Sequence, residues 1–169
     1  MKLLFSHQEI VETSKKIAQQ INQKFQGKSP VVVCVLKGSA PFHSELIKHI
    51  DLDITVDYMQ VSSYSGTQST GKITLKKDLD QDICGKDVIV VEDIVDTGLT
   101  LTHLKAELLS RNPASLTFVS MLDKPSRRKT DFVPDMVGKT IDDLFVIGFG
   151  LDLDEKYRNL KDIYVFDQD

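Results

Sequence analysis

The chain has 169 residues, of which 41% are hydrophobic and 27% are charged. These values exclude a disordered chain and, at this length, predict a single domain over residues 1–169. The formal net charge is −4 and the pI is near 5.5, so the chain lacks the basic excess of nucleic-acid-binding proteins and no nucleic-acid partner is expected.

The apolar segments are too short for a membrane protein. The longest runs, residues 31–36 and 88–91, have the length of strands and fall well below the ~20 residues that span a bilayer. Residues 1–7 lack the apolar core and the small-residue cleavage site of a secretory signal. We therefore expect a cytoplasmic protein that does not contact a membrane.

The N-terminal segment predicts an amphipathic helix over residues 6–25. Ser6 and Glu9 form the S-x-x-E pattern of a capping box, in which each side chain accepts a backbone N–H of the other residue. Apolar residues then recur at helical spacing up to Phe25, and Gly27 is suited to end the helix.

Two strands, a second helix and a long loop are expected next. The continuous β-branched run at residues 31–36 is typical of a strand that is covered on both faces, as in a parallel sheet. A helix beginning at Pro41 follows, and residues 54–62 alternate like a strand. Residues 63–71 contain little apolar surface and predict a long loop of the kind that often serves as a lid.

The second half of the chain continues the alternation of strands and helices. Residues 88–91 form another fully apolar strand, and the helix that follows places Leu101, Leu104 and Leu108 on one face. Further strands are expected at residues 115–122, 144–147 and 163–166. This order predicts an α/β domain with a mostly parallel central sheet flanked by helices.

The most informative segment follows the strand at residues 88–91 and reads E-D-I-V-D-T-G-L-T. In open α/β sheets ligands bind outside the carboxyl ends of the strands, so the acids of this segment are candidate binding groups. The turn at residues 96–100 can hold a phosphate through backbone N–H groups, threonine hydroxyls and the dipole of the following helix. Glu92 and Asp93, just upstream, can hold sugar hydroxyls or the water around Mg²⁺.

Other interpretations of this segment are open at this point. Asp and Thr before Gly can serve only as a helix cap, although a cap does not need the three acids Glu92, Asp93 and Asp96. An aspartate-nucleophile phosphatase requires D-x-D, whereas this chain has D-x-x-D. The pattern G-x-x-x-x-G-K-[ST] is absent, and Gly148 with Gly150 lacks the third glycine of a dinucleotide site and predicts a turn.

The strand followed by E-D-I-V-D-T-G-L-T resembles the phosphoribosyl pyrophosphate loop of type I phosphoribosyltransferases. Further motifs occur in the order typical of the hypoxanthine-guanine phosphoribosyltransferases, so the resemblance covers nearly the whole chain. These motifs are Leu36-Lys37-Gly38-Ser39, Ser63-Tyr64, Lys124, Phe145-Val146, and Asp152 with Arg158. Leu99 is a departure, because some relatives carry lysine there.

This resemblance implies a fold and a reaction. The fold is a type I phosphoribosyltransferase domain with a core at roughly residues 25–125, a small hood from the N- and C-terminal segments, and a lid at residues 63–72. The reaction moves the 5-phosphoribosyl group of phosphoribosyl pyrophosphate to N9 of hypoxanthine, giving IMP and diphosphate, and to guanine, giving GMP. Such an enzyme serves purine salvage and requires Mg²⁺.

The resemblance also assigns the substrate-binding residues. Asp96 is the candidate catalytic acid or base near purine N7, although a purely loop-shaping role is open. The implied phosphoribosyl pyrophosphate or nucleotide contacts are Lys37, Gly38, Ser63, Tyr64, Glu92, Asp93, Asp96, Thr97, Gly98, Leu99, Thr100 and Arg158. The implied Mg²⁺ ligands are Glu92, Asp93 and Asp152, and the Leu36–Lys37 peptide is expected to be cis.

For the base, the resemblance implies that Lys124 donates to the 6-oxo group and that Phe145 stacks on the ring. Backbone carbonyls of Val146 and Asp152 would face the 2-position. The lysine ammonium and the 6-amino group of adenine are both hydrogen-bond donors, so both would be left unpaired, and adenine should be a poor substrate. Relatives are usually dimers or tetramers, and a homodimer or homotetramer is expected. A regulator of the same fold that binds RNA is the alternative to an enzyme, and it would require a basic face.

Overall fold

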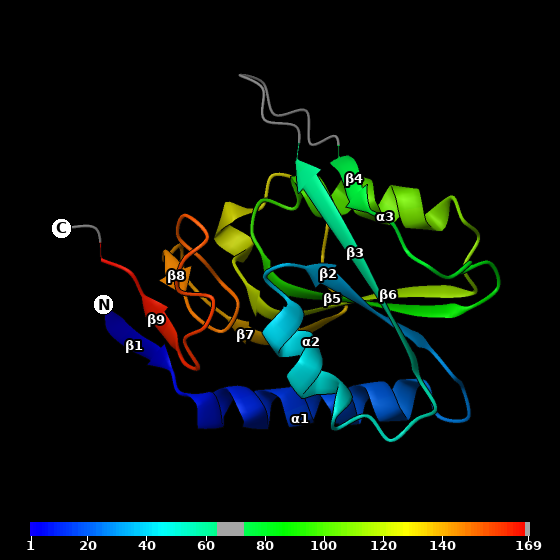
Figure 1. The fold of residues 1–169 in the computed structure, drawn as a ribbon, viewed down its shortest axis with the longest axis horizontal. Helices are drawn as coiled ribbons and strands as arrows, with labels where there is room; N and C mark the ends of the chain where they lie inside the picture. Colours follow the sequence, from blue (N-terminus) through cyan, green and yellow to red (C-terminus); the bar gives the residue numbers. More distant parts are fainter. Residues whose placement is uncertain (64–72, 168–169) are drawn as a thin grey trace.

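A six-stranded sheet forms the centre of the computed structural model, which describes residues 1–63 and 73–167 (Figure 1). All neighbouring strands are parallel except β3 and β4, which confirms the prediction of a mostly parallel sheet. Across the sheet the strands are β4 (Ile73–Lys77), β3 (Thr55–Ser63), β2 (Val31–Leu36), β5 (Asp87–Val95), β6 (Ser115–Asp123) and β7 (Met136–Thr140).

The predicted N-terminal helix is α1 (His7–Lys24), and it begins at the predicted capping box. The N–H of Glu9 donates to Ser6 Oγ at 3.3 Å, and the N–H of Ser6 donates to Glu9 Oε2 at 2.8 Å. The next helix is α2 (Ala40–Ile47), with Pro41 in its first turn as predicted. Both the start of α1 and the position of α2 therefore follow from local sequence signals.

The central strands are buried on both faces because their side chains alternate between two helical layers. Val32 packs in the layer that contains Phe42 and the apolar face of α1. Its neighbour Val33 points to the opposite layer, with Leu104 of α3 (Leu99–Leu109). All four side chains are fully buried. The prediction that β2 is covered on both faces is therefore confirmed, because helices cover each face of the sheet.

The two ends of the chain form a second, antiparallel sheet at one side of the domain (Figure 1). It contains β1 (Lys2–Phe5), β9 (Ile163–Val165) and β8 (Val146–Ile147), in that order. Gly148 and Leu151 form an isolated bridge, so the predicted turn around Gly150 is confirmed. A 3₁₀ turn, η1 (Pro125–Arg127), follows β6 and leads towards β7.

The strand at residues 88–91 extends further than predicted. It continues through Glu92 and Asp93 to Val95, because its pairing with β6 persists as far as Val95 opposite Asp123. The expectation that the acids directly follow the strand is therefore wrong. Two carboxylates are carried by the strand itself, and only Asp96 follows it.

The predicted lid at residues 63–72 lies, apart from the backbone of Ser63, outside the described residues. Among the described residues, no helix is both long enough and apolar enough to cross a membrane.

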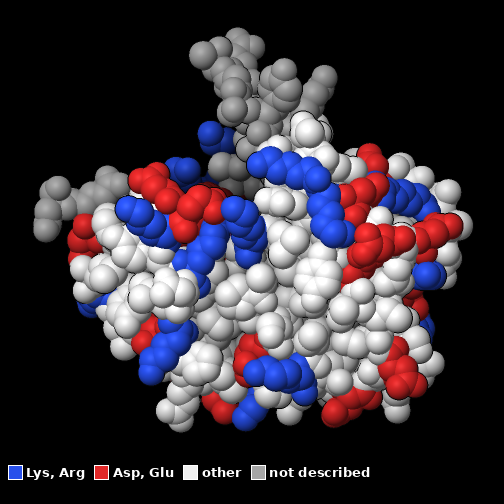
Figure 2. Space-filling view, in the orientation of Figure 1, with Lys and Arg blue, Asp and Glu red and all other residues white. Residues whose placement is uncertain are grey.

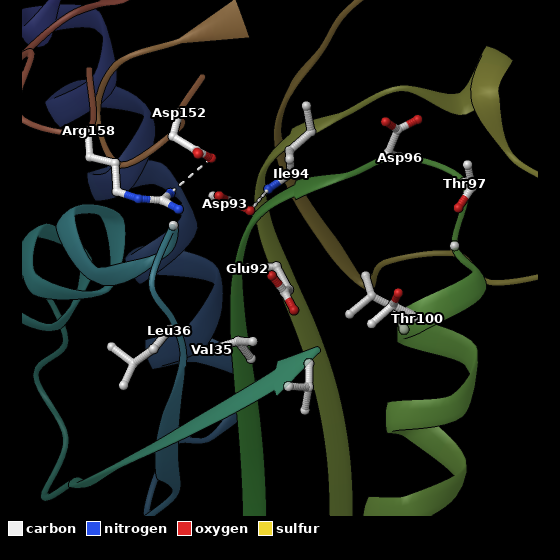
Figure 3. Close-up of a pocket in the computed structure, with 14 residues that line it drawn as sticks. Val35, Leu36, Glu92, Asp93, Ile94, Asp96, Thr97, Thr100, Asp152 and Arg158 are labelled. Atoms are coloured by element: carbon white, nitrogen blue, oxygen red, sulfur yellow. Dashed lines mark hydrogen bonds and ion pairs between the residues drawn. The ribbon is translucent and has the colours of Figure 1, made fainter. Parts of the chain in front are cut away.

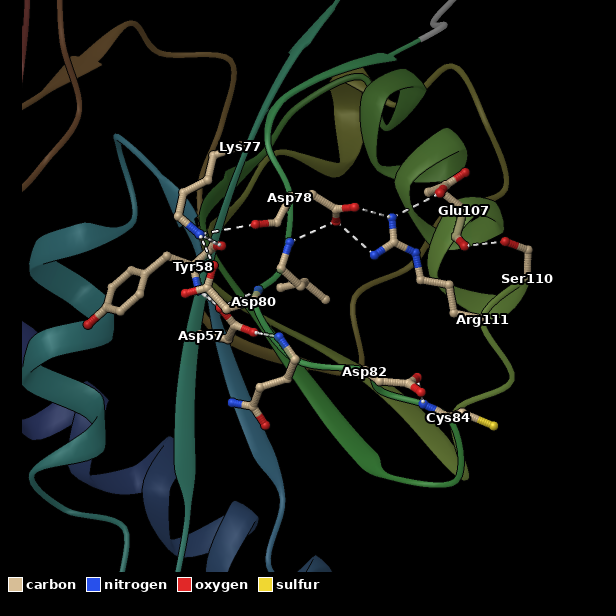
Figure 4. Close-up of polar contacts among 12 residues, drawn as sticks. Asp57, Tyr58, Lys77, Asp78, Asp80, Asp82, Cys84, Glu107, Ser110 and Arg111 are labelled. Atoms are coloured by element: carbon tan, nitrogen blue, oxygen red, sulfur yellow. Dashed lines mark hydrogen bonds and ion pairs between the residues drawn. The ribbon is translucent and has the colours of Figure 1, made fainter.

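The segment between β4 and β5 is anchored by a buried carboxylate on β3 (Figure 4). Asp57 is only 2% exposed. Its Oδ1 accepts the N–H groups of Tyr58 at 2.8 Å and Asp80 at 3.2 Å, and its Oδ2 accepts that of Gln81 at 2.9 Å. A buried carboxylate is tolerated when backbone donors surround it in this way, so Asp57 fixes this connection to the sheet.

Replacing this carboxylate tests its structural role. Asp57→Ala leaves the three N–H groups without their acceptor and should lower the free energy of unfolding by about 2 kcal/mol in urea melts followed by circular dichroism. Asp82→Ala is the matched control, because Asp82 is exposed and accepts only the N–H of Cys84, at 2.9 Å. Equal losses in the two variants would contradict the anchoring role.

Candidate active site

A cavity of ≈ 340 Å³ lies where the carboxyl ends of β2 and β5 meet (Figure 3). The two strands pair in parallel from Val31 opposite Val88 to Cys34 opposite Val91, so both chains leave the sheet at the same edge. Most of the predicted phosphoribosyl pyrophosphate residues line this cavity: Gly38, Glu92, Asp93, Asp96, Thr97, Gly98, Thr100, Asp152 and Arg158. The structure therefore gathers into one cavity residues that are up to 120 positions apart in the sequence.

The turn after β5 leads directly into the N-terminus of α3. Gly98 is the N-cap residue of this helix and has a left-handed φ of 80°. It offers no side chain to cap the helix, and the N–H of Leu99 meets Thr97 Oγ1 at a long 3.4 Å. The N–H groups of the first helical turn are thus available to an anion in the cavity, where the helix dipole favours negative charge.

The segment after β6 braces this turn from outside. Arg128 donates through one guanidinium nitrogen to the carbonyl oxygen of Asp96 at 2.6 Å, and the N–H of Lys129 donates to the carbonyl oxygen of Thr97 at 2.8 Å. A Cβ on Gly98 would approach Arg128 Cδ to 2.9 Å. The turn is therefore a fixed element, and glycine is needed at residue 98 for space as well as for its φ.

The side chain of Asp96 is held by an arginine that the sequence analysis did not identify. Arg127 Nε donates to Asp96 Oδ1 at 3.1 Å, and another nitrogen of Arg127 lies 3.7 Å from Asp143. Asp143 in turn lies 3.9 Å from the ammonium of Lys124. Charges of alternating sign therefore connect the candidate catalytic aspartate with the candidate base-reading lysine.

Glu92 and Asp93 carry perturbed pKa values. Burial, reinforced by the charge of Asp93, raises the pKa of Glu92 well above its ordinary range. Burial also raises the pKa of Asp93 to about 6, although its own carboxylate accepts the N–H of Ile94 at 2.7 Å. Two neighbouring acids that resist ionisation would be stabilised by donors or by a cation, and such acids are typical of binding sites.

These acids fit a magnesium ion that is shared with a substrate. Glu92, Asp93 and Asp152 line the same cavity, but within residues 1–63 and 73–167 no group of three metal-ligating side chains lies close enough to enclose an ion. Mg²⁺ usually keeps several waters and takes one or two carboxylates together with substrate phosphate oxygens. The donor set therefore suits Mg²⁺ that enters with a polyphosphate, and not a permanently bound ion.

Two glycines allow the loop after β2 to approach the rest of the site. The Leu36–Lys37 peptide is cis, as the resemblance implied. A Cβ on Gly38 would overlap the carboxylate of Asp93, and a Cβ on Gly150 would overlap the carbonyl oxygen of Gly38. The loop is thus packed between β5 and the C-terminal part of the chain, with no space for side chains at these two contacts.

Arg158 reaches the cavity from the C-terminal segment. One of its terminal nitrogens donates to the carbonyl oxygen of Gly150 at 2.6 Å and lies 3.2 Å from Asp152 Oδ1. Its Nε is buried and has no hydrogen-bond partner among the described residues. The guanidinium is therefore fixed in position beside Asp93 and Asp152, where a planar cation can bind an oxyanion.

Of the four candidate base-binding residues, Asp152 lines this cavity, whereas Lys124, Phe145 and Val146 lie outside it. Lys124 is only 7% exposed, and its N–H donates to the carbonyl oxygen of Val95 at 2.9 Å. Phe145 is 43% exposed and contacts Phe166 edge to face, and Val146 is buried in β8. Lys37 and Leu99 do not line the cavity either. The side chain of Ser63 and all of Tyr64 lie outside the described residues.

Comparison with known proteins identifies the family. Residues 2–155 match the family model described as "Phosphoribosyl transferase domain". The chain belongs to the phosphoribosyl transferase family. The resemblance inferred from the sequence motifs is thereby confirmed.

Named relatives within the phosphoribosyl transferase family are similar over nearly their full length. The hypoxanthine-guanine phosphoribosyltransferase of Streptococcus thermophilus is 48% identical over 94% of this chain and 89% of its own. The crystal structure of a hypoxanthine-guanine phosphoribosyltransferase from Bacillus anthracis is 47% identical with a TM-score of 0.95, covering 98% of each chain. A hypoxanthine phosphoribosyltransferase structure from Staphylococcus aureus is 46% identical with a TM-score of 0.96, covering 99% of this chain and 91% of that one.

The sequence did not predict that Arg127 and Arg128 contact Asp96. The available signal was the basic run Arg127-Arg128-Lys129 in a chain with net charge −4. A run of exposed charges usually indicates only a solvated surface, and nothing in the local sequence connects this run with the turn about 30 residues upstream. The contacts become visible only when β5 and β6 are placed side by side.

The close packing of the loop after β2 can be tested at Gly150. Gly150→Ala introduces both a left-handed φ for a residue with a Cβ and an overlap with the carbonyl oxygen of Gly38. Gly85→Ala is the matched control, because Gly85 has a φ of 71° and nothing within 4 Å of its Cβ position. In urea melts the control should lose about 1–2 kcal/mol of unfolding free energy and Gly150→Ala at least twice as much. Equal losses would show that the overlap does not constrain the loop.

Proposed function

We propose that this phosphoribosyl transferase is a hypoxanthine-guanine phosphoribosyltransferase of purine salvage. It transfers the 5-phosphoribosyl group of phosphoribosyl pyrophosphate to N9 of hypoxanthine, giving IMP and diphosphate, and to guanine, giving GMP. The named relatives support this reaction. The observation that carries the proposal is the cavity that combines the 96–100 turn with Glu92, Asp93 and Arg158.

In this proposal the 96–100 turn binds the 5-phosphate of the substrate. The phosphate accepts backbone N–H groups at the start of α3, with the hydroxyls of Thr97 and Thr100 beside it. Because Arg128 and Lys129 already hold the turn, phosphate binding requires little reorganisation of the backbone. Glu92 and Asp93 accept hydrogen bonds from the 2- and 3-hydroxyls of the ribose, which supplies donors to two half-buried acids whose pKa values are raised.

The diphosphate is bound by the opposite side of the cavity. Gly38 in the cavity wall and Lys37 directly before it present backbone N–H groups, and the guanidinium of Arg158 donates to the leaving oxygens. Glu92, Asp93 or Asp152 would hold Mg²⁺ that enters with the substrate, and the ion would supply positive charge beside the leaving group. The protein thus stabilises the negative charge that develops as the bond to ribose C1 breaks.

Asp96 is the proposed acid or base at purine N7. Support for this role is that Asp96 directly follows β5 and lines the cavity, and that its partner Arg127 also lies 3.7 Å from Asp143, the neighbour of Lys124. The ion pair with Arg127 holds the carboxylate in one orientation, which is the requirement for proton transfer at a fixed distance.

The base is recognised by Lys124, which directly follows β6, and by residues of the C-terminal segment. Lys124 offers a nearly buried ammonium whose Asp143 neighbour, at 3.9 Å, is too distant to satisfy it fully. It donates to the 6-oxo group, Phe145 stacks on the ring with its half-exposed face, and the carbonyls of Val146 and Asp152 read the 2-position. Residues 63–72, with Ser63 and Tyr64, would cover the site and limit capture of the activated sugar by water.

The oligomeric state and location are part of the same proposal. We infer a homodimer or homotetramer in the cytoplasm. Val56 and Tyr58 are 39% and 38% exposed, and they lie two residues apart on one face of β3, which supplies apolar surface for association. An RNA-binding regulator is less well supported, because basic and acidic side chains alternate on the face seen in Figure 2.

A parallel assay with four bases tests the function. With phosphoribosyl pyrophosphate and Mg²⁺, hypoxanthine and guanine should turn over and adenine should not. The rate with xanthine, compared with the rate with guanine, will show whether the site accepts an oxo group at the 2-position. Asp96→Asn should reduce kcat by about 10²–10⁴-fold, the usual contribution of a positioned acid or base. Asp51→Asn, an exposed acid outside the cavity, is the control.

Two outcomes would contradict the proposal. Absence of turnover with every purine would exclude a salvage enzyme and favour a binding role for the same fold. Full activity of Asp96→Asn with normal hypoxanthine turnover in the wild type would leave the enzyme assignment intact and reject Asp96 as the catalytic residue.

A further inference from the structure

A glutamate that no part of the proposed reaction uses lies between two cations of the diphosphate side. Glu155 Oε2 is 2.8 Å from Lys37 Nζ, and Glu155 Oε1 is 3.1 Å from a terminal nitrogen of Arg158. Each carboxylate oxygen is thus engaged by a different cation. Lys37 comes from the loop after β2 and Arg158 from the C-terminal segment, so this one carboxylate joins the two parts of the chain that the substrate must also join.

The backbone at Glu155 is unusual for this residue type. The N–H of Leu153 donates to the carbonyl oxygen of Lys156 and the reverse bond is also present, at 3.2 and 3.0 Å, which makes a two-residue turn of Asp154 and Glu155. Both turn residues have left-handed φ values, 51° and 67°. Turns of this kind favour Asn-Gly or Asp-Gly, and a glutamate in the second position is strained. Such strain is typical of functional positions.

A further contact fixes the direction of the side chain. The N–H of Glu155 donates to Asp152 Oδ2 at 2.9 Å, while Asp152 Oδ1 contacts Arg158 at 3.2 Å. The turn, the backbone N–H and the guanidinium therefore position the carboxylate together. Glycine would avoid the strain but would remove the carboxylate. The strained turn therefore serves to hold the Glu155 carboxylate between Lys37 and Arg158.

The two cations are of the kind that a diphosphate requires. Diphosphate is a multiply charged oxyanion, and an ammonium with a guanidinium binds it by charge-assisted hydrogen bonds. A carboxylate between the same cations is an anion that accepts hydrogen bonds from both, as a phosphate group does, but with less negative charge. The side chains of Lys37 and Glu155 are 56% and 62% exposed, so their ion pair can be exchanged at small cost when a stronger anion arrives.

We propose that Glu155 is an internal substitute for diphosphate, which holds Lys37 and Arg158 in place before substrate binds and is displaced when the diphosphate group binds. The inference rests on the proposed function and adds a regulator of affinity to it. Glu155 competes with phosphoribosyl pyrophosphate on entry and with diphosphate before release. It weakens the binding of both and favours departure of the product.

Calorimetric titration with inorganic diphosphate and Mg²⁺ tests this inference directly. Glu155→Gln keeps the size of the side chain and removes its charge, so the dissociation constant for diphosphate should fall about three- to tenfold, the range expected when weak competing ion pairs are lost. Glu12→Gln is the matched control, because Glu12 forms an exposed pair with Lys15 on α1, at 3.4 Å, and should leave the constant unchanged.

The sign of the change decides between competition and support. If Glu155 only braces Arg158, then Glu155→Gln will bind diphosphate more weakly, and this result or an unchanged constant would overturn the inference. Glu155→Gly guards against misfolding of the first variant, because glycine relieves the left-handed φ while removing the carboxylate. It should also bind diphosphate more tightly, and weaker binding by this folded variant would again overturn the inference.

The same titration separates this inference from the proposed function. Wild-type protein that binds no diphosphate with Mg²⁺ and turns over no purine would overturn both. Wild-type protein that binds diphosphate and turns over hypoxanthine, with no tightening in either Glu155 variant, would overturn the inference alone.

Discussion

The parallel pairing of β2 with β5 is the constraint on which the rest of the site depends. It sets Val31 beside Val88 and brings the loop after β2 and the turn after β5 to the same edge of the sheet. The pairing is stable because Val32 and Val33 are buried in opposite helical layers, each fully covered. A substrate with phosphate groups at both ends can then contact two strand ends at once, which neither loop could achieve alone.

Charge at this edge is organised in opposed pairs. Asp96 lies against Arg127, and Glu155 lies against Lys37 and Arg158. Burial raises the pKa values of the two β5 acids, Glu92 and Asp93. Several charged side chains of the site are therefore already paired with opposite charges within the protein. Substrate binding exchanges partners within this network, so little charge is left uncompensated before or after the exchange.

Much of the fold could be predicted because its signals are local. The capping box of α1, the apolar run of β2 and the E-D-I-V-D-T-G-L-T segment each specify an element without reference to distant residues. The strands β1, β4 and β7 were missed. β7 contains a glycine, and β1 and β4 are short and only partly buried, which weakens their patterns.

The site was predictable where a contiguous motif carries it and not where tertiary contacts do. The residues of the 96–100 turn were identified from sequence, whereas the contacts of Arg127, Arg128 and Glu155 were not. Arg127 and Arg128 contact Asp96, which lies in another segment of the chain. Glu155 contacts Lys37, also from another segment, and is positioned by a strained turn. Single charged residues of this kind have no distinctive local pattern, so their roles emerge only from the packing of β6 and the C-terminal segment against β5 and β2.

The most direct test of the account is X-ray diffraction from crystals of this protein grown with GMP. The account predicts the 5-phosphate on the backbone N–H groups of residues 97–100, the ribose hydroxyls on Glu92 and Asp93, and the purine between Lys124 and Phe145. A nucleotide bound with its phosphate away from this turn, or with its base in the place of the phosphate, would contradict the assignment of the 96–100 turn as the phosphate site.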